Sequence, residues 1–202
     1  TLLVGRKVKV LLGDVDLLRW KQDLIEDRNR LATLYAAAEQ VSIARDDKLL
    51  KLREQIASKC KNPINPGNRK VMVFTAFADT ATYLYEQLAG WAKAELGLET
   101  ALVTGSGRNQ TTVPSLRRDL TSILTAFSPR SKERPEELAG EGEIDLLIAT
   151  DCISEGQNLQ DCDYCVNYDS HWNPVRIIQR CGRIDRIGSR NEVIQLVNLW
   201  PE

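Results

Sequence analysis

The stretch that decides the fold class is Asp145-Leu146-Leu147-Ile148-Ala149, which is followed directly by Thr150 and Asp151. Its apolar side chains stand at consecutive positions, which is typical of a strand buried on both faces. Similar short apolar runs occur at residues 71–77, 100–104, 144–149, 164–168 and 193–199. Helical patterns lie between them, at residues 80–96, 115–127 and 175–184. This alternation predicts an α/β fold in which a parallel sheet of five or more strands is sandwiched by helices.

The residues before this alternating part have a different pattern. Apolar residues recur at mostly helical spacing, and Asp14 or Asp16 is placed to cap the start of the helix. A second helical pattern follows and ends at the loop 61–68, which contains two prolines, a glycine and three asparagines. We therefore expect a helical arm and linker over residues 1–66 and an α/β domain over residues 67–202.

The composition excludes some classes of protein. The 27 basic and 28 acidic residues give a net charge of −1, which argues against a strongly basic nucleic-acid-binding tail but not against a local basic patch. The longest apolar run is far shorter than the roughly 18 residues of a membrane helix. We expect no membrane association and no signal peptide. Because the chain lacks an initiator Met, we expect it to be part of a longer one.

Five cysteines are an odd number, and they are scattered, which is typical of reduced thiols inside the cell. Cys162 and Cys165 form a lone CxxC pair. A structural zinc ion needs four ligands, and the chain offers no second CxxC and a single histidine, His171. We therefore expect a structural role for this pair and no metal site.

The last third of the chain carries a dense group of arginines. Five of them fall within residues 176–190, against one acid, Asp185. Arg180, Arg183 and Arg186 are spaced three apart, so on a helix followed by a turn they would line one side. Planar guanidinium groups at this density suit a polyanion, because each binds phosphate oxygens through two hydrogen bonds.

A plainer interpretation of the arginines stays open, namely a solvated helix face with ion pairs to Asp185 or Asp169. Gly182 weighs against it, because glycine costs about 1 kcal/mol inside a helix and indicates a close approach of backbone.

Short polar residues follow the apolar strand at 145–149. Thr150 and Asp151 end it, and Gly156 and Asn158 come shortly after. Open α/β sheets bind ligands outside the carboxyl ends of their strands, so these residues are placed to contact phosphate and sugar groups. Alternatively, Thr150 and Asp151 only cap the following turn.

Four segments, in this order, resemble the helicase motifs IV, V, Va and VI: residues 71–77, then 149–151 with 155–159, then Trp172-Asn173-Pro174, then Gln179-x-x-Gly182-Arg183-x-x-Arg186-x-Gly188. Over about residues 45–200, the chain looks like the C-terminal RecA-like lobe of a superfamily 2 ATPase. Trp172-Asn173-Pro174 resembles the corresponding motif of the Swi/Snf branch. Residues 155–159 resemble the form found in the bacterial RNA-polymerase-recycling relatives of that branch. Two features differ from this branch. Gly182 matches the DEAD-box form of motif VI, and the segment 128–143 is longer than a minimal lobe requires.

The resemblance implies roles for particular residues. Arg183 and Arg186 would be arginine fingers on the γ-phosphate of ATP. Three residues would lie at the nucleotide: Gly156, Asn158 and Gln179. Three would contact nucleic acid: Thr75, Thr104 and Thr150. The stretch 105–135 has six bases and two acids, so its charge makes Arg108 a further candidate for contact with the nucleic-acid backbone.

The resemblance also implies the second motor lobe of an ATP-dependent DNA translocase or helicase. No G-x-x-x-x-G-K-[ST] phosphate loop occurs in the sequence, so ATP with Mg²⁺ would bind only jointly with an N-terminal motor lobe. We expect a monomer that binds duplex DNA in the cytoplasm, at a bacterial nucleoid. An RNA helicase lobe and a non-catalytic docking module for nucleic acid or protein are the alternatives.

Overall fold

The computed structural model describes residues 3–200 apart from 42, 106, 154–155 and 170–172. Its contacts divide the chain into two compact units, residues 1–47 and 48–202. The division comes earlier than the predicted boundary at residue 66, because the second helix packs into the core of the second unit through Leu49, Leu52 and Ile56.

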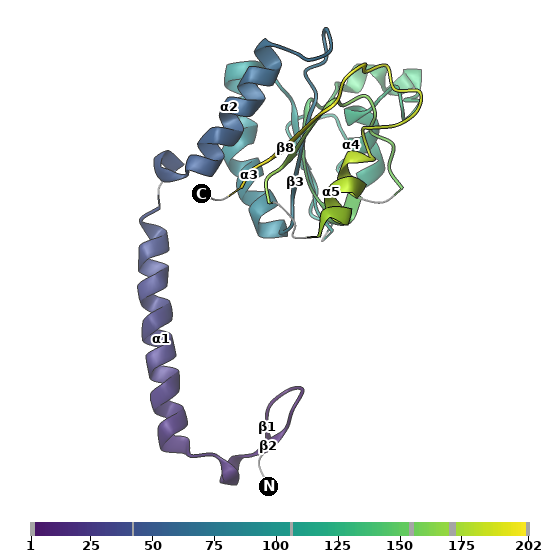
Figure 1. Cartoon of the computed structure of the whole chain (residues 1–202). Helices are drawn as coiled ribbons and strands as arrows, with labels where there is room; N and C mark the ends of the chain where they lie inside the picture. The colour runs from purple at the N-terminus through teal and green to yellow at the C-terminus, as the bar shows by residue number, and fades with distance from the viewer. Residues whose placement is uncertain (1–2, 42, 106, 154–155, 170–172, 201–202) are drawn as a thin grey trace. The chain divides into compact units, whose positions relative to one another are not determined.

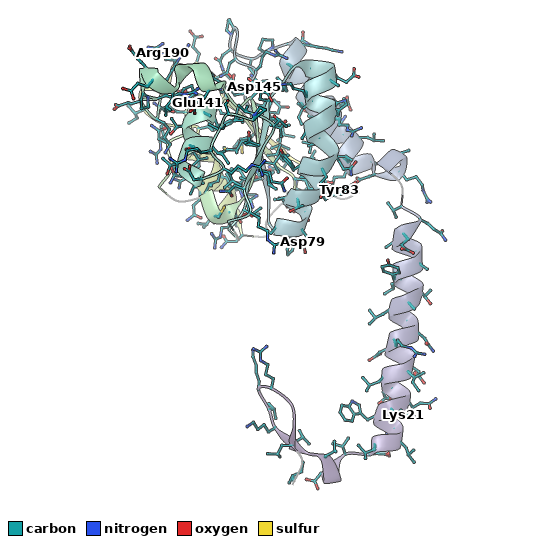
Figure 2. The ribbon with its side chains drawn as sticks, turned by 180° about the vertical axis from the view of Figure 1, so that it is seen from behind. Lys21, Asp79, Tyr83, Glu141, Asp145 and Arg190 are labelled. Atoms are coloured by element: carbon teal, nitrogen blue, oxygen red, sulfur yellow. The ribbon has the colours of Figure 1, made fainter. Side chains whose placement is uncertain are left out.

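The first unit contains a short hairpin and one long helix. Its elements are β1 (Leu3–Val4), β2 (Val10–Leu11), η1 (Leu12–Asp14), α1 (Leu17–Glu39) and η2 (Ile43–Arg45). Asp16 caps α1, since its carboxylate accepts a hydrogen bond from the Arg19 amide at 3.1 Å. The helix has no buried residue, and its side chains, Lys21 among them, stand out from the ribbon in Figure 2.

The second unit is the α/β domain. Its helical elements are α2 (Asp47–Lys61), α3 (Ala78–Trp91), the π-helical η3 (Ala92–Leu96), α4 (Leu120–Phe127), η4 (Glu136–Glu141), η5 (Asp151–Ile153) and α5 (Pro174–Cys181). Its strands are β3 (Val71–Thr75), β4 (Thr100–Val103), β5 (Gln110–Thr111), β6 (Leu146–Thr150), β7 (Tyr164–Asn167) and β8 (Gln195–Asn198). No helix among the described residues is long and apolar enough to cross a membrane.

The strands form one sheet in the order β5-β4-β6-β3-β7-β8. Neighbouring strands are parallel, except that the short β5 is antiparallel to β4. The sequence predicted the five parallel strands and missed the short β5. The parallel arrangement matters for function because it brings the carboxyl ends of five strands to one edge.

Alternate residues of each central strand face opposite layers of helices (Figure 1). Val71 and Val73 of β3 pack in one core with α2 and α3. Met72 and Phe74 pack in the other core with α4 and with Ile184, which follows α5. This burial on both faces confirms the α/β class that the consecutive apolar positions predicted.

Two helix ends differ from the sequence predictions. Helix α4 begins at Leu120 because the Asp119 carboxylate accepts the Ser122 amide at 2.9 Å. Helix α5 ends at Cys181, where the Arg183 amide bonds to the carbonyl three residues back, that of Arg180. Arg183 therefore lies in the turn that follows α5, and Arg186 lies just beyond that turn, so Arg180 alone of the three arginines is on the helix itself.

Candidate nucleotide and nucleic-acid site

Three threonines lie at the carboxyl edge of the sheet, each at the end of a different strand. Thr75 and Thr150 are in register across β3 and β6, and Thr104 directly follows β4, the other neighbour of β6. Ligands of open α/β sheets bind outside this edge. The fold thus brings together the three threonines that the sequence predicts as nucleic-acid contacts.

These threonines lie beneath the surface of the edge. Thr75 is fully buried, and Thr104 and Thr150 are 6% and 8% exposed. The Thr75 hydroxyl donates to Oδ2 of Asp169 at 2.5 Å, and the Thr150 hydroxyl to Sγ of Cys152 at 3.3 Å. In the state seen here Thr75 serves to hold a neighbouring carboxylate, and a contact with nucleic acid stays a prediction.

Arg108 lies in the loop that follows β4. The loop is closed at its base, because the Thr104 amide donates to the Asn109 side chain at 3.3 Å and the Gly107 amide donates to the Thr104 carbonyl at 3.1 Å. The Arg108 side chain is exposed. Its position next to Thr104 places a cation at the same edge as the threonines.

Arg180 of α5 is the largest fully buried side chain of the described residues. Its Nε donates to Oδ1 of Asp151 at 2.7 Å, and its Nη1 donates to Oδ1 of Asn167 at 2.9 Å. The guanidinium also stacks over the Phe74 ring, with 5.1 Å to the centroid. Arg180 therefore ties α5 to the ends of three strands, and Asp151 pairs with it instead of only capping a turn.

Arg183 is joined to the segment that follows β6. Its carbonyl accepts the Leu159 amide at 3.0 Å, and its Nη1 donates to the Gln157 carbonyl at 3.5 Å. Gly156, with φ of +74°, and Asn158 flank Gln157. The structure thus brings the predicted arginine finger and two predicted nucleotide contacts to one place, although Arg183 is only 9% exposed.

A second cation lies beside these residues. Lys132 donates from Nζ to Oε1 of Gln157 at 2.6 Å. Burial lowers the pKa of Lys132, and the charge of Arg186 lowers it further. Arg186 is itself exposed, with its Nε bonded to the Gly182 carbonyl at 3.1 Å. A group of positive charges around one turn favours the binding of an anion.

Two further sequence predictions concern Gln179, in α5, and Gly182, which follows it. Oε1 of Gln179 is buried and has no hydrogen-bond partner among the described residues, so it is an unused acceptor. Its contact with a nucleotide stays a prediction. Gly182 does not mark a close approach within this chain. A Cβ there would meet only the carbonyls of Ile178 and Gln179, at 3.5 and 3.7 Å, and its φ of −61° suits any residue.

Sequence reasoning missed the partner of Asp169. Its ion pair is with Lys48 of α2, at 3.2 Å, rather than with an arginine of the 176–190 segment. Lys48 and Asp169 are far apart in the sequence, so no local spacing could indicate the pair. Ser154, Glu155, His171 and Trp172, which belong to the predicted motifs or to the zinc interpretation, lie outside the described residues.

The CxxC cysteines are free and fully buried. Burial raises the pKa of Cys162 to about 12 and that of Cys165 beyond the usual thiol range. Both side chains pack in the core with α4. A thiol so protonated is a poor nucleophile and a poor metal ligand, which fits a structural role.

Comparison with known proteins identifies the family. Residues 47–188 match the helicase conserved C-terminal domain. The chain is 32% identical over 124 residues to the uncharacterized ATP-dependent helicase YqhH of Bacillus subtilis, covering 61% of this chain and 18% of that protein. It is 30% identical over 119 residues to the putative ATP-dependent DNA helicase fml2 of Schizosaccharomyces pombe, covering 59% and 13%. The chain thus spans less than a fifth of either relative.

Among solved structures, the C-terminal part of the Fun30 ATPase domain is similar at 17% identity and a TM-score of 0.49, covering 75% of this chain and 40% of that one. The family match covers well over half of the chain and includes every described element that builds the site from α2 to α5. This match confirms the predicted helicase C-terminal domain, and the mostly parallel sheet confirms the predicted α/β fold. The chain belongs to the family of helicase conserved C-terminal domains.

Proposed function

We propose that this chain is the second motor lobe of an ATP-dependent DNA translocase or helicase of the Swi/Snf type. The observation that carries the proposal is the junction of Arg183 with the turn at Gly156–Asn158. This junction forms one wall of a phosphate site, and the sequence offers no phosphate loop for the other wall. The matched relatives are named ATP-dependent helicases, and one of them a DNA helicase.

In this proposal Arg183 and Arg186 face an ATP held by a first lobe. Phosphoryl transfer develops charge on the equatorial oxygens, and a guanidinium from across the cleft stabilises that charge. Arg186 is exposed and ready to do so. The 3.5 Å contact of Arg183 with Gln157 is at the outer limit of a hydrogen bond, so it is exchanged at little cost.

In this proposal, the remaining contacts with the nucleotide come from both lobes. Gly156 and Asn158 present backbone and amide groups toward the ribose, and the buried oxygen of Gln179 adds an acceptor. Among the described residues, no three His, Cys, Asp or Glu side chains are grouped to hold a metal ion. In this proposal Mg²⁺ is held by the first lobe and by the phosphates themselves.

Nucleic acid would lie along the carboxyl edge. Thr104, Thr150 and Arg108 are at this edge, and the Arg180 network links it to α5. A change at the nucleotide side of α5 would thereby reach the ends of β3, β6 and β7. This linkage gives the lobe a path between hydrolysis and movement along a strand.

The proposal is tested by phosphate release in two proteins: the 202-residue chain alone, and the same chain joined to a first motor lobe. We expect no hydrolysis by the chain alone, and hydrolysis stimulated by duplex DNA in the joined protein. Turnover by the pure chain would contradict the half-site. Stimulation by single-stranded RNA instead of duplex DNA would favour an RNA helicase lobe, and no stimulation by either would favour a docking module.

A further inference from the structure

A carboxylate stands at the edge that the proposed function assigns to a polyanion. Asp169, two residues beyond β7, accepts the Thr75 hydroxyl at 2.5 Å and the Ala76 amide at 3.3 Å through Oδ2. Its side chain is 25% exposed. An uncompensated negative charge here would repel nucleic-acid phosphates from the ends of β3 and β6.

Lys48 compensates this charge from another element. Its Nζ lies 3.2 Å from Oδ1 of Asp169 and 4.3 Å from the centroid of the Tyr168 ring. Two contacts therefore fix the ammonium group, one to the carboxylate and one to the neighbouring aromatic face. Burial raises the pKa of Asp169, but the hydrogen bonds from Thr75 and Lys48 outweigh it and bring the pKa below its ordinary value.

A second acid of this edge, at the end of β6, also has a partner. Asp151 pairs with Arg180 at 2.7 Å, and Arg180 also contacts the backbone carbonyl of Asp169 at 3.4 Å. Two carboxylates and two cations thus balance at the ends of β6 and β7. Loss of Lys48 would leave one negative charge in excess.

We propose that Lys48 is a positioning residue for nucleic-acid binding, which acts by neutralising Asp169. Asp169 orients the Thr75 hydroxyl and the Ala76 amide through one acceptor oxygen, Oδ2. Lys48 pairs with the other oxygen, Oδ1, and removes the electrostatic cost of keeping that carboxylate at a phosphate-binding edge. The inference rests on the proposed function, because it takes nucleic acid as the ligand of this edge. It assigns no direct phosphate contact to Lys48.

The test is a set of variants of the 202-residue chain, measured by fluorescence anisotropy with a labelled DNA duplex at about 50 mM salt. We expect Lys48→Met to weaken affinity by about three- to tenfold, as an unscreened like charge near one phosphate would. Asp169→Asn should bind more tightly than the wild type, since asparagine keeps an acceptor for Thr75 but carries no charge. The double variant should recover the affinity lost by Lys48→Met.

Lys51→Met is the matched control. Lys51 lies on the same helix and pairs with a different acid, Glu54, at 2.7 Å, so the variant removes the same charge without unpairing Asp169. It should bind as the wild type does. Thermal unfolding of every variant separates the effect from a structural one, because a positioning role moves the affinity and leaves the melting temperature within a few degrees.

Three outcomes would overturn the inference. Lys48→Met could bind like the wild type, the double variant could stay as weak as Lys48→Met, or Asp169→Asn could weaken binding. The second outcome would make Lys48 a phosphate ligand. The wild type is measured first, at about 50 and 200 mM salt, and a DNA affinity that does not fall with salt contradicts the proposed function itself.

Discussion

Arg180 is a buried structural residue that also lies beside the proposed nucleic-acid site. It is fully buried, although arginine is among the residues least often found inside proteins. Its partners come from three places in the sequence: Asp151 after β6, Asn167 in β7 and Phe74 in β3. The pair with Asp151 joins Arg180 to a carboxylate of its own lobe.

Removing this side chain leaves Asp151 without its partner beside the core. We expect Arg180→Ala to lower the free energy of unfolding by about 3–5 kcal/mol, the range for breaking a buried ion pair. Urea denaturation followed by circular dichroism measures it. Arg108→Ala, at an exposed position, is the control and should stay within about 0.5 kcal/mol of the wild type. Equal stability of the two variants would show that the Arg180 network contributes nothing to the fold.

At the scale of the element, the strands were predictable and several helix ends were not. A strand such as β6 shows itself by consecutive apolar residues, because both of its faces are buried. Helix α4 starts five residues later than predicted because its start is set by one capping carboxylate, that of Asp119. The threonine edge followed from the parallel strands, whereas the Lys48–Asp169 pair joins distant segments that no local pattern connects.

The cap of α4 makes a prediction about pH. Hydrogen bonds from the Ser122 amide and hydroxyl lower the pKa of Asp119. A carboxyl group whose folded pKa is depressed stabilises the fold above its unfolded pKa of about 3.9, and the contribution disappears as the pH falls through the folded pKa. Asp119→Ala should therefore cost about 0.5–2 kcal/mol near pH 7 and progressively less on acidification.

Urea midpoints of the wild type and Asp119→Ala between neutral pH and about pH 2 check this, the acid limit lying below the ordinary carboxyl range. Asp119→Asn is the control, because an asparagine cap accepts the same amide hydrogen without titrating. A stability difference that stays constant with pH would contradict the assignment of the cap to the ionised carboxylate.

At the scale of the whole molecule, the α/β unit has its own core. Every member of its two apolar clusters lies after residue 48. Residues 47–202 should therefore unfold cooperatively, with a melting temperature within about 4 °C of that of the full chain. Differential scanning calorimetry of both proteins tests this. A shortened chain without a cooperative transition would show that residues 1–46 are needed to complete the fold.

The central claim is that Arg183 and Arg186 act on an ATP held by another lobe. Arg190 offers a matched control: it comes from the same arginine-rich segment but lines a polar hollow beside the amino ends of the strands. Figure 2 shows it at the opposite end of the unit from Asp79, which lies at the start of α3 just beyond the carboxyl end of β3.

The most direct measurement is the rate of ATP hydrolysis, at saturating ATP and duplex DNA, by the chain joined to a first motor lobe. Arg183→Ala and Arg186→Ala should each fold normally, bind ATP nearly normally and lose hydrolysis by up to about 10³–10⁵-fold, while Arg190→Ala keeps the wild-type rate. Wild-type turnover by Arg183→Ala and Arg186→Ala would contradict the account and leave a lobe that only docks its partners.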